Sequence, residues 1–172
     1  MTFRIATPAD APALRALIER AYRGRAARAG WTHEADLLDG PRTTPAAIDD
    51  ILADPAQRVL LRHADAALVA SVVVANCGDG TAYLGMLAVD PAAQAQGLGR
   101  ALIDAAEAFA AREWGATRME MTVIHVRAEL IAYYERRGYA LTGETRAWPP
   151  YVVLPERPLE LVVMAKAMGD PL

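Results

Sequence analysis

A turn that contains two glycines is the part of the sequence best suited to bind a ligand. It runs from Leu87-Ala88-Val89, in a predicted strand, through Gln94-Ala95-Gln96-Gly97-Leu98-Gly99-Arg100 into a predicted helix. The N-terminus of a helix offers unpaired backbone N–H groups and the positive end of the helix dipole, which together suit a pyrophosphate. Glycine at positions 97 and 99 removes the Cβ atoms that would block close approach of a ligand. Binding here would therefore come from backbone amides.

Two known nucleotide-binding motifs fit this turn poorly. A Walker-type phosphate loop needs Gly-Lys-Ser/Thr, which the sequence lacks. The dinucleotide fingerprint needs a third glycine where Leu102 stands, and the preceding strand does not open a βαβ unit. Glycines that serve only packing remain an alternative.

The predicted helices and strands place this turn between a strand and a helix of a mixed α/β fold. Cap residues, hydrophobic periodicity and proline or glycine stops predict helices over residues 7–23, 44–52, 98–114 and 128–137. β-rich runs predict strands over residues 58–62, 67–76, 82–89 and 118–124, then one that begins at Tyr139 and one over residues 159–166. Residues 24–42 are predicted to form a long, partly helical connection. This order implies an α/β fold with three layers and helices on both faces of the sheet.

Composition limits the classes of function. The chain has 172 residues, 53% of them hydrophobic, which predicts one globular domain over residues 1–172. A balance of 18 basic and 21 acidic residues argues against nucleic acid and anionic membranes as partners and favours a cationic one. The single cysteine, Cys77, excludes internal disulfides and multi-cysteine metal sites and fits a reducing cytoplasm. We expect no metal, and no membrane-spanning helix, because the apolar runs are too short.

Two blocks of sequence resemble the GNAT superfamily of N-acetyltransferases. Gln94-x-x-Gly97-x-Gly99 resembles its acyl-CoA-binding signature, Gln/Arg-x-x-Gly-x-Gly/Ala. The block Tyr133-Tyr134-Glu135-Arg136-Arg137-Gly138-Tyr139 resembles the family's Leu-Tyr-Glu-Lys-x-Gly-Phe element. The blocks have the family's order and separation, and the predicted elements follow the family's order over nearly the whole chain. The resemblance implies the three-layer α-β-α acyl-CoA N-acyltransferase fold, with a mixed sheet splayed at the coenzyme cleft.

The resemblance also implies how the coenzyme binds. The backbone of Leu87 to Val89 would hold the pantetheine arm, and the amides of Ala95 to Arg100 would hold the pyrophosphate. One of the strand amides would polarise the thioester carbonyl. Many family members carry a pantetheine-contacting asparagine where Arg127 stands; this arginine could instead reach a phosphate, reach an acidic acceptor, or face solvent. The coenzyme-binding residues so implied are Leu87, Ala88, Val89, Gln94, Ala95, Gln96, Gly97, Leu98, Gly99, Arg100, Arg127 and Tyr134.

An acid and a base are the catalytic roles to fill. Tyr134 matches the family's tyrosine that donates to the coenzyme sulfur, so it is the predicted general acid, whereas Tyr133 is the predicted packing residue. Some relatives use a glutamate where Thr122 stands. Glu120, two residues earlier and on the same strand face, is the predicted base, directly or through water. Glu34, Asp36, His125 and bulk water are the alternatives for this role.

Two segments are predicted to form the wall that contacts the acceptor. They follow the first helix and join the last two strands, and they contribute Trp31, Glu34, Trp148 and Tyr151. The aromatic faces suit an acceptor with an apolar portion. The alternatives are a hydrophobic plug for Trp31 and a loop anchor for Trp148. Glu34, Asp36 and Glu120 favour a cationic amine.

The resemblance thus predicts an N-acetyltransferase. It would move an acetyl group from acetyl-CoA to a primary amine of a small molecule or peptide, by direct attack in a ternary complex, and a homodimer is compatible with this architecture. A non-catalytic acyl-CoA-binding or sensing module is the first alternative. A nicotinamide-dependent oxidoreductase is the second.

Overall fold

A computed structural model of the chain describes residues 2–23, 28, 34–94 and 97–169. Seven strands form one mixed sheet in the order β1-β2-β3-β4-β5-β7-β6. The strands are β1 (Arg4–Ile5), β2 (Gln57–Ala64), β3 (Ala67–Gly78), β4 (Thr81–Val89), β5 (Arg118–Ile124), β6 (Ala140–Arg146) and β7 (Leu161–Ala167). Only β4 and β5 pair in parallel, and every other neighbouring pair is antiparallel.

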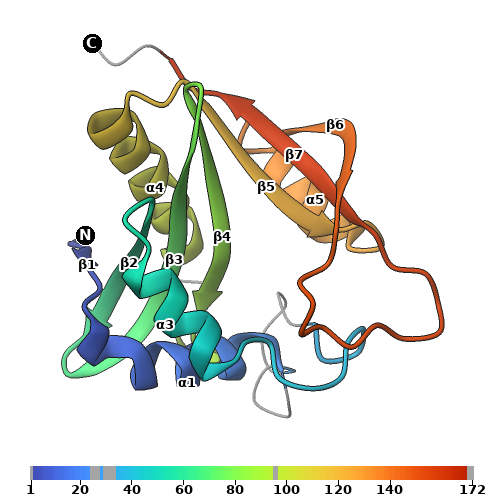
Figure 1. The fold of residues 1–172 in the computed structure, drawn as a ribbon, viewed down its shortest axis with the longest axis horizontal. Helices are drawn as coiled ribbons and strands as arrows, with labels where there is room; N and C mark the ends of the chain where they lie inside the picture. The colour runs from blue at the N-terminus through green and yellow to red at the C-terminus, as the bar shows by residue number, and fades with distance from the viewer. Residues whose placement is uncertain (1, 24–27, 29–33, 95–96, 170–172) are drawn as a thin grey trace.

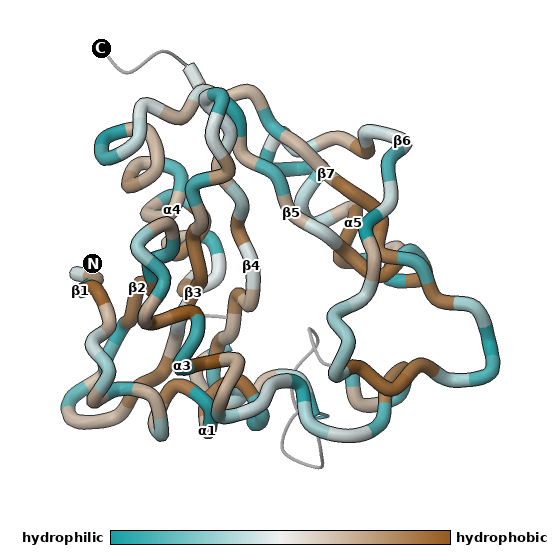
Figure 2. Tube along the Cα trace, viewed as in Figure 1, coloured by the Kyte–Doolittle hydropathy of each residue, from teal (hydrophilic) through white to brown (hydrophobic). Residues whose placement is uncertain are grey.

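Helices cover both faces of this sheet, which confirms the predicted three layers. They are α1 (Ala11–Tyr22), α3 (Pro45–Ala53), α4 (Leu98–Trp114) and α5 (Ala128–Glu135), with short 3₁₀ turns η1 (Pro8–Asp10) and η2 (Pro91–Ala93). Side chains alternate along a strand, so neighbouring residues face opposite layers. In β3, Val73 packs in the cluster that contains α1 and α3, whereas Val72 and Val74 pack against α4. Hydrophobic residues accordingly follow the central strands (Figure 2).

Local sequence explains where the helices begin and end. The hydroxyl of Thr44 accepts a hydrogen bond of 3.1 Å from the amide of Ala47, and Pro45 follows it, as predicted for the start of α3. The helix α4 ends at Gly115, which adopts the left-handed conformation that favours glycine (φ 61°). Within the described residues, no helix has the length and apolar character needed to cross a membrane.

The sheet opens between β4 and β5. These two strands pair only from Thr81 to Tyr83 with Arg118 to Glu120, although both continue well beyond this point. Figure 1 shows them diverging as the two arms of a V, with β6, β7 and α5 on the arm of β5. The splayed sheet implied by the family resemblance is therefore present.

Two loops lie together at the open end of the V. The segment after α1 and the loop between β6 and β7 are joined by a β-bridge between Asp39 and Val153. Leu38, Ile124 and Leu159 form a small buried cluster at this junction. Residues far apart in sequence thus enclose the space between the two strands.

The structure differs from the sequence expectations at a few elements. Strand β1 was not predicted, because its two residues, both exposed, show no alternating pattern. The first helix begins with the 3₁₀ turn η1, whose N-cap is Thr7 as predicted, and the Asp10 carboxylate accepts hydrogen bonds from the amide and the hydroxyl of Thr7. Of the connection 24–42, residues 34–42 contain turns, and most of the remainder lies outside the described residues.

Candidate active site

Two adjoining hollows occupy the opening of the sheet. The first, here called the glycine-turn groove, has a volume of about 170 Å³ and is lined by Leu87, Val89, Gln94, Gly97, Leu98, Gly99, Arg100, Leu130, Tyr133, Tyr134 and Arg137. The second, here called the splay cavity, has a volume of about 420 Å³ and is lined mainly by residues of β4, β5, α1, α5 and the two loops at the open end, with single residues from α3, β2, β3, β6 and β7. They share Leu87, Leu130 and Tyr134. A small molecule in the cavity and an elongated one in the groove would therefore meet at Tyr134.

The groove is built around the N-terminus of α4. Gly97 adopts a left-handed conformation (φ 73°), and among the described residues no atom beyond its chain neighbours lies within 4 Å of where a Cβ would stand. The amide of Ala101 makes the first intrahelical bond, to the carbonyl of Gly97, so the preceding helical amides have no intrahelical acceptor. The side-chain amide of Gln94 donates to the carbonyl of Val89 at 3.4 Å and ties the turn to β4. This arrangement can bind an anion through backbone N–H groups.

A β-bulge shapes the strand beside the groove. Between the pairs Ser71–Ala88 and Val73–Gly85, β4 contains one more residue than β3, and Met86 has a positive φ of 45°. The hydroxyl of Tyr22, at the end of α1, donates to the carbonyl of Leu87. Burial raises the pKa of Tyr22 to about 12, so the donor stays protonated. The last residues of β4 are thus fixed on the side of α1.

Tyr134 lies where the two hollows meet. Its side chain is 7% exposed, and it stacks edge to face with Tyr133 and Tyr139. Burial raises its pKa far above the usual range for a tyrosine. Among the described residues, no side chain or backbone group makes a hydrogen bond with its hydroxyl. A protonated hydroxyl at this junction can donate to a group that develops negative charge.

The end of α5 adds a cation to the groove. The guanidinium of Arg137 lies 3.3 Å from the centre of the Tyr133 ring and donates to the carbonyl of Tyr133 at 2.8 Å. Its Nε is buried and makes no hydrogen bond within the described part of the chain. The side chain of Arg100 is 74% exposed and lies 3.7 Å from Asp104. Ala95 and Gln96, also predicted to bind the coenzyme, lie outside the described residues.

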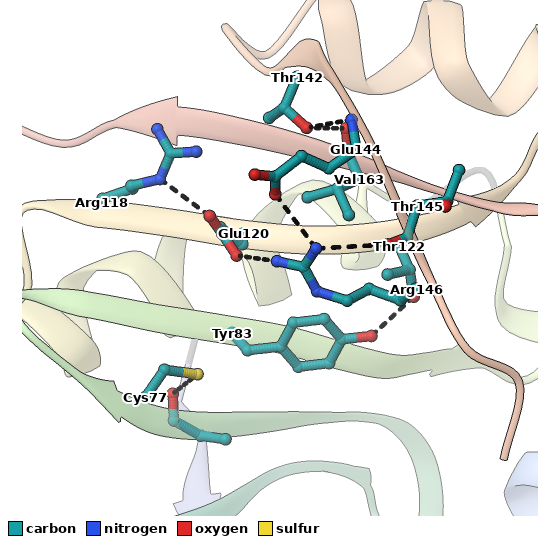
Figure 3. Close-up of polar contacts among 11 residues, drawn as sticks. Cys77, Tyr83, Arg118, Glu120, Thr122, Thr142, Glu144, Thr145, Arg146 and Val163 are labelled. Carbon is teal, nitrogen blue, oxygen red and sulfur yellow. Dashed lines mark hydrogen bonds and ion pairs between the residues drawn. The ribbon is translucent and has the colours of Figure 1, made fainter.

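Glu120 does not line either hollow. Its carboxylate oxygens lie 3.0 Å from Arg118 and 3.4 Å from Arg146, and Arg146 also contacts Glu144 at 3.1 Å (Figure 3). Thr122, two residues along β5, does line the splay cavity, and its hydroxyl lies 2.8 Å from that of Tyr83. Glu120 is therefore held in a network of ion pairs beside the cavity.

The other titratable candidates are also engaged. The Nδ1 of His125 accepts a hydrogen bond of 3.0 Å from the amide of Glu160. The carboxylate of Glu34 lies 2.6 Å from Arg23 and 3.3 Å from Arg42, and Asp36 lies 3.2 Å from Arg28. Glu34 and Asp36, two of the acids expected to favour a cationic amine, are therefore each paired with arginine. In the described ranges no group of three His, Cys, Asp or Glu side chains is arranged to hold a metal ion.

The structure brings three of the four residues predicted to contact the acceptor to the splay cavity. Glu34, Trp148 and Tyr151 line it, whereas Trp31 lies outside the described residues. The indole Nε1 of Trp148 donates to the carbonyl of Leu159 at 2.8 Å, so this side chain also anchors its loop. Arg127 lines the cavity rather than the groove, and the Ala88 side chain packs on the opposite side of β4, near α1.

Several lining residues were missed from the sequence. Tyr22, Arg23, Arg42 and Tyr83 all line the splay cavity. Tyr22 and Arg23 end a helix, and Tyr83 stands in a strand, where each looks like an ordinary structural residue. Arg42 follows a stretch without periodicity. Pro41 next to Arg42 marks a turn but gives no sign of which side chain faces the cavity.

Comparisons with known proteins agree with this geometry. A family model described as the acetyltransferase (GNAT) family matches residues 13–139. None of the curated proteins matches this sequence. The fold is similar to that of the ribosomal-protein-S18-alanine N-acetyltransferase from Escherichia coli (TM-score 0.74, 19% identity, 99% of this chain and 95% of that chain).

Two further solved structures are similar over nearly their full lengths. Nourseothricin acetyltransferase has a TM-score of 0.66 and 25% identity, over 98% of each chain. The spermidine N-acetyltransferase from Vibrio cholerae, solved with CoA and spermine, has a TM-score of 0.69 and 17% identity, over 97% of this chain and 95% of that chain.

Proposed function

Because this chain belongs to the GNAT acetyltransferase family and is an acyltransferase, we propose that it transfers an acetyl group from acetyl-CoA to a primary amine. The acceptor would be a small molecule or a peptide. The observation that carries this proposal is the junction of the glycine-turn groove with the splay cavity at Tyr134. One hollow would take the coenzyme, the other would take the acceptor, and their contents would meet beside a buried hydroxyl.

The groove suits the phosphates and pantetheine arm of the coenzyme. The amides at the start of α4 would bind the pyrophosphate, and the open space at Gly97 leaves room for its close approach. The arginine at 137 adds a positive charge on the same groove. The edge of β4 beyond Tyr83, unpaired by β5, would hydrogen-bond the pantetheine arm as an added strand would. A net charge of -3 does not oppose this, because the binding groups are local.

Both substrates would react in one ternary complex. The acetyl thioester supplies the electrophilic carbonyl carbon, which the neutral amine attacks while the carbon–sulfur bond breaks. An amide of β4 near Leu87 would stabilise the oxyanion, and Tyr134 would donate its proton to the leaving thiolate and recover one from solvent. The amine would lose its proton to water in the cavity. Glu120 would hold Arg146 in place rather than act directly as the base, because both of its oxygens contact arginines.

Product analysis tests the proposal. The protein would be incubated with acetyl-CoA and a panel of amines, and acetylated products would be identified by mass spectrometry. Acetylation of at least one amine is expected, with stoichiometric release of CoA. Thermal stabilisation by acetyl-CoA without any product would favour the binding or sensing module. Stabilisation by NAD and not by acetyl-CoA would favour an oxidoreductase and overturn the proposal.

A further inference from the structure

The residues that line the splay cavity, among those the structure describes, carry more positive than negative charge. Four arginines line it, namely Arg23, Arg42, Arg127 and Arg146, against one carboxylate, that of Glu34. Glu120 and Glu144 pair with Arg146 from outside the cavity. Apart from Arg127, which no printed contact joins to Glu34, the group formed by Arg23, Arg42 and Glu34 has one cation in excess. We refer to these three residues as the arginine cluster.

Glu34 is already neutralised within this cluster. Its Oε2 lies 2.6 Å from Arg23 and 3.3 Å from Arg42, and all three side chains are less than one-fifth exposed. A protonated amine that approached Glu34 would have to displace a buried guanidinium or share the carboxylate with it. Like charges at close range oppose each other strongly in a partly dehydrated site. The cluster therefore disfavours a cation and favours an anion.

Arg42 is the member of the cluster best placed to meet a ligand. Burial opposes its charge, but the Glu34 carboxylate and Tyr22 outweigh burial, so the pKa of Arg42 is raised and the side chain stays charged. Its side chain is 19% exposed, against 7% for that of Arg23, and its buried Nε faces the Glu34 carboxylate at 3.3 Å. Its guanidinium lies 5.0 Å from the centre of the Tyr22 ring, whose hydroxyl donates to the carbonyl of Leu87. One tyrosine side chain thus separates the cluster from the strand end shared by both hollows.

We propose that the acceptor amine also carries a carboxylate, which Arg42 and its cluster bind while the amine faces Leu87 and Tyr134. This inference rests on the proposed acetyl transfer for the identity of the amine. One carboxylate matches the single excess charge of the cluster, and a guanidinium binds a carboxylate through two parallel hydrogen bonds. The aromatic side chains of Tyr83, Trp148 and Tyr151 would contact the apolar part of the acceptor. The substrate class is therefore an amino acid or another small amino-carboxylic acid.

Binding of three matched probes tests the charge preference directly. The probes are 3-phenylpropionate, 3-phenylpropylamine and 3-phenylpropanamide, which share a body and differ in charge. Their affinities would be measured by calorimetry with and without saturating CoA, in a buffer free of carboxylates and phosphate. We expect the carboxylate to bind at least about tenfold more tightly than the amine. Equal affinities, tighter binding of the amine, or no detectable binding of the carboxylate would overturn the proposal.

Substitutions identify the residue responsible. Arg42→Met should reduce the preference for the carboxylate to about threefold or less, whereas Arg42→Lys should retain part of it. Arg112→Met is the matched control, because Arg112 is 68% exposed on α4 and does not line the cavity. Circular dichroism would confirm that each variant folds. A preference that survives in a folded Arg42→Met variant would contradict the assignment to Arg42.

An activity measurement separates this inference from the proposed function. Matched pairs of amines, such as phenylalanine with phenylalaninamide and with phenethylamine, would be compared as acceptors by kcat/KM. Acetylation that favours the carboxylate members supports both proposals. Acetylation that favours the amides or the decarboxylated amines would support acetyl transfer and contradict the proposal that the acceptor carries a carboxylate. Probe selectivity without acetylation of any amine would overturn acetyl transfer and leave an anion-binding cavity.

Discussion

At the scale of single residues, the chemistry depends on a hydroxyl that stays protonated. Burial raises the pKa of Tyr134, so at neutral pH it can donate but does not carry charge into the groove. A general acid of this kind typically contributes 10²- to 10⁴-fold to a rate. We therefore expect Tyr134→Phe to lower kcat by about a hundredfold, while the KM for acetyl-CoA changes by less than about threefold. Steady-state kinetics under conditions in which chemistry limits the rate would measure both values.

Tyr139 provides the matched control for this substitution. It belongs to the same group of aromatic rings, but its hydroxyl donates to Glu107 at 2.8 Å and lines neither hollow. Tyr139→Phe should lower the melting temperature and keep kcat within about threefold of the native value. If the two variants lose kcat equally, the effect arises from packing, and Tyr134 has no special role as the acid.

Short-range sequence patterns revealed part of the site and could not reveal the rest. Tyr134 and the glycine turn were found because each stands in a compact motif whose spacing is set by one helix or one turn. The arginine cluster and the pairing of Glu120 with Arg146 were missed, because their partners are 8 to 26 residues apart and no local motif joins them. The net charge that the cavity presents to a ligand depends on which acids and arginines are paired. The sequence alone shows the acids without their arginine partners and so favours a cationic acceptor, whereas the paired charges support the carboxylate-bearing acceptor proposed above.

At the scale of elements, both ends of α4 use glycine in the same backbone conformation for different purposes. Gly97 and Gly115 have φ values of 73° and 61°, and a Cβ at either would meet no atom of the other described residues within 4 Å, chain neighbours aside. A non-glycine residue in this conformation costs about 1–2 kcal/mol. We expect Gly97→Ala and Gly115→Ala each to lower the free energy of unfolding by about this amount, as measured by urea denaturation.

Only the first of these substitutions should affect the coenzyme. Gly97 lines the groove, so a methyl group there would occupy space proposed for the pyrophosphate, whereas Gly115 lies at the opposite end of the helix. Gly97→Ala should therefore weaken acetyl-CoA binding by about tenfold or more, measured by calorimetry, while Gly115→Ala should leave it within about twofold. Equal affinities in the two variants would place the phosphates elsewhere.

The start of α1 is stabilised by a carboxylate whose effect should depend on pH. Hydrogen bonds from Arg4, at 2.6 and 2.9 Å, and from the amide of Thr7, at 2.7 Å, hold the pKa of Asp10 well below its usual range. In acid the unfolded chain then binds a proton that the folded chain does not. The contribution of Asp10 to the free energy of unfolding is therefore complete above the ordinary aspartate pKa of about 4. It is lost as the pH falls through the lower pKa that Asp10 has in the folded chain.

Asp10→Asn tests this contribution. At pH 7 the variant should unfold with a free energy lower by about 1 kcal/mol, and the difference from the native protein should shrink below about pH 4. Asp104→Asn is the control, since Asp104 is 64% exposed and lies 3.7 Å from its partner Arg100. Urea denaturation at several pH values would show the trend. A difference that stays constant into acid would contradict an ionised, hydrogen-bonded Asp10.

The sequence predicted elements best where local chemistry decides their limits. The predicted strand 118–124 and helix 98–114 have the bounds of β5 and α4, because the hydrophobic period, a glycine stop and β-branched residues agree there. The sequence predicted elements least well where pairing with another strand decides whether a strand forms. β1 exists through pairing of Arg4 and Ile5 with Leu61 and Leu60, and such pairing leaves no pattern in a two-residue strand.

At the scale of the whole molecule, the sheet consists of two halves joined by a short seam. Three residue pairs connect β4 and β5, whereas β3 and β4, or β5 and β7, pair along most of their lengths. The seam leaves the edge of β4 past Tyr83 without a neighbouring strand. A coenzyme that adds to this edge would supply hydrogen bonds that the sheet lacks. Its binding should therefore stabilise the unpaired end of β4 and the start of α4 more than the rest of the molecule.

Amide hydrogen exchange can detect this local stabilisation. With saturating acetyl-CoA, peptides that cover residues 84–90 and 97–101 should exchange more slowly, because the ligand would bond their amides directly. Peptides from α3 lie across the sheet from the groove and should be affected only through global stability, by RT ln(1 + [L]/Kd), which is about 2.7 kcal/mol at 100 times Kd. Measuring exchange under conditions where local opening dominates separates the two effects. Equal slowing in all peptides would indicate a ligand that stabilises the fold without adding to β4, and the proposed binding mode would then be wrong.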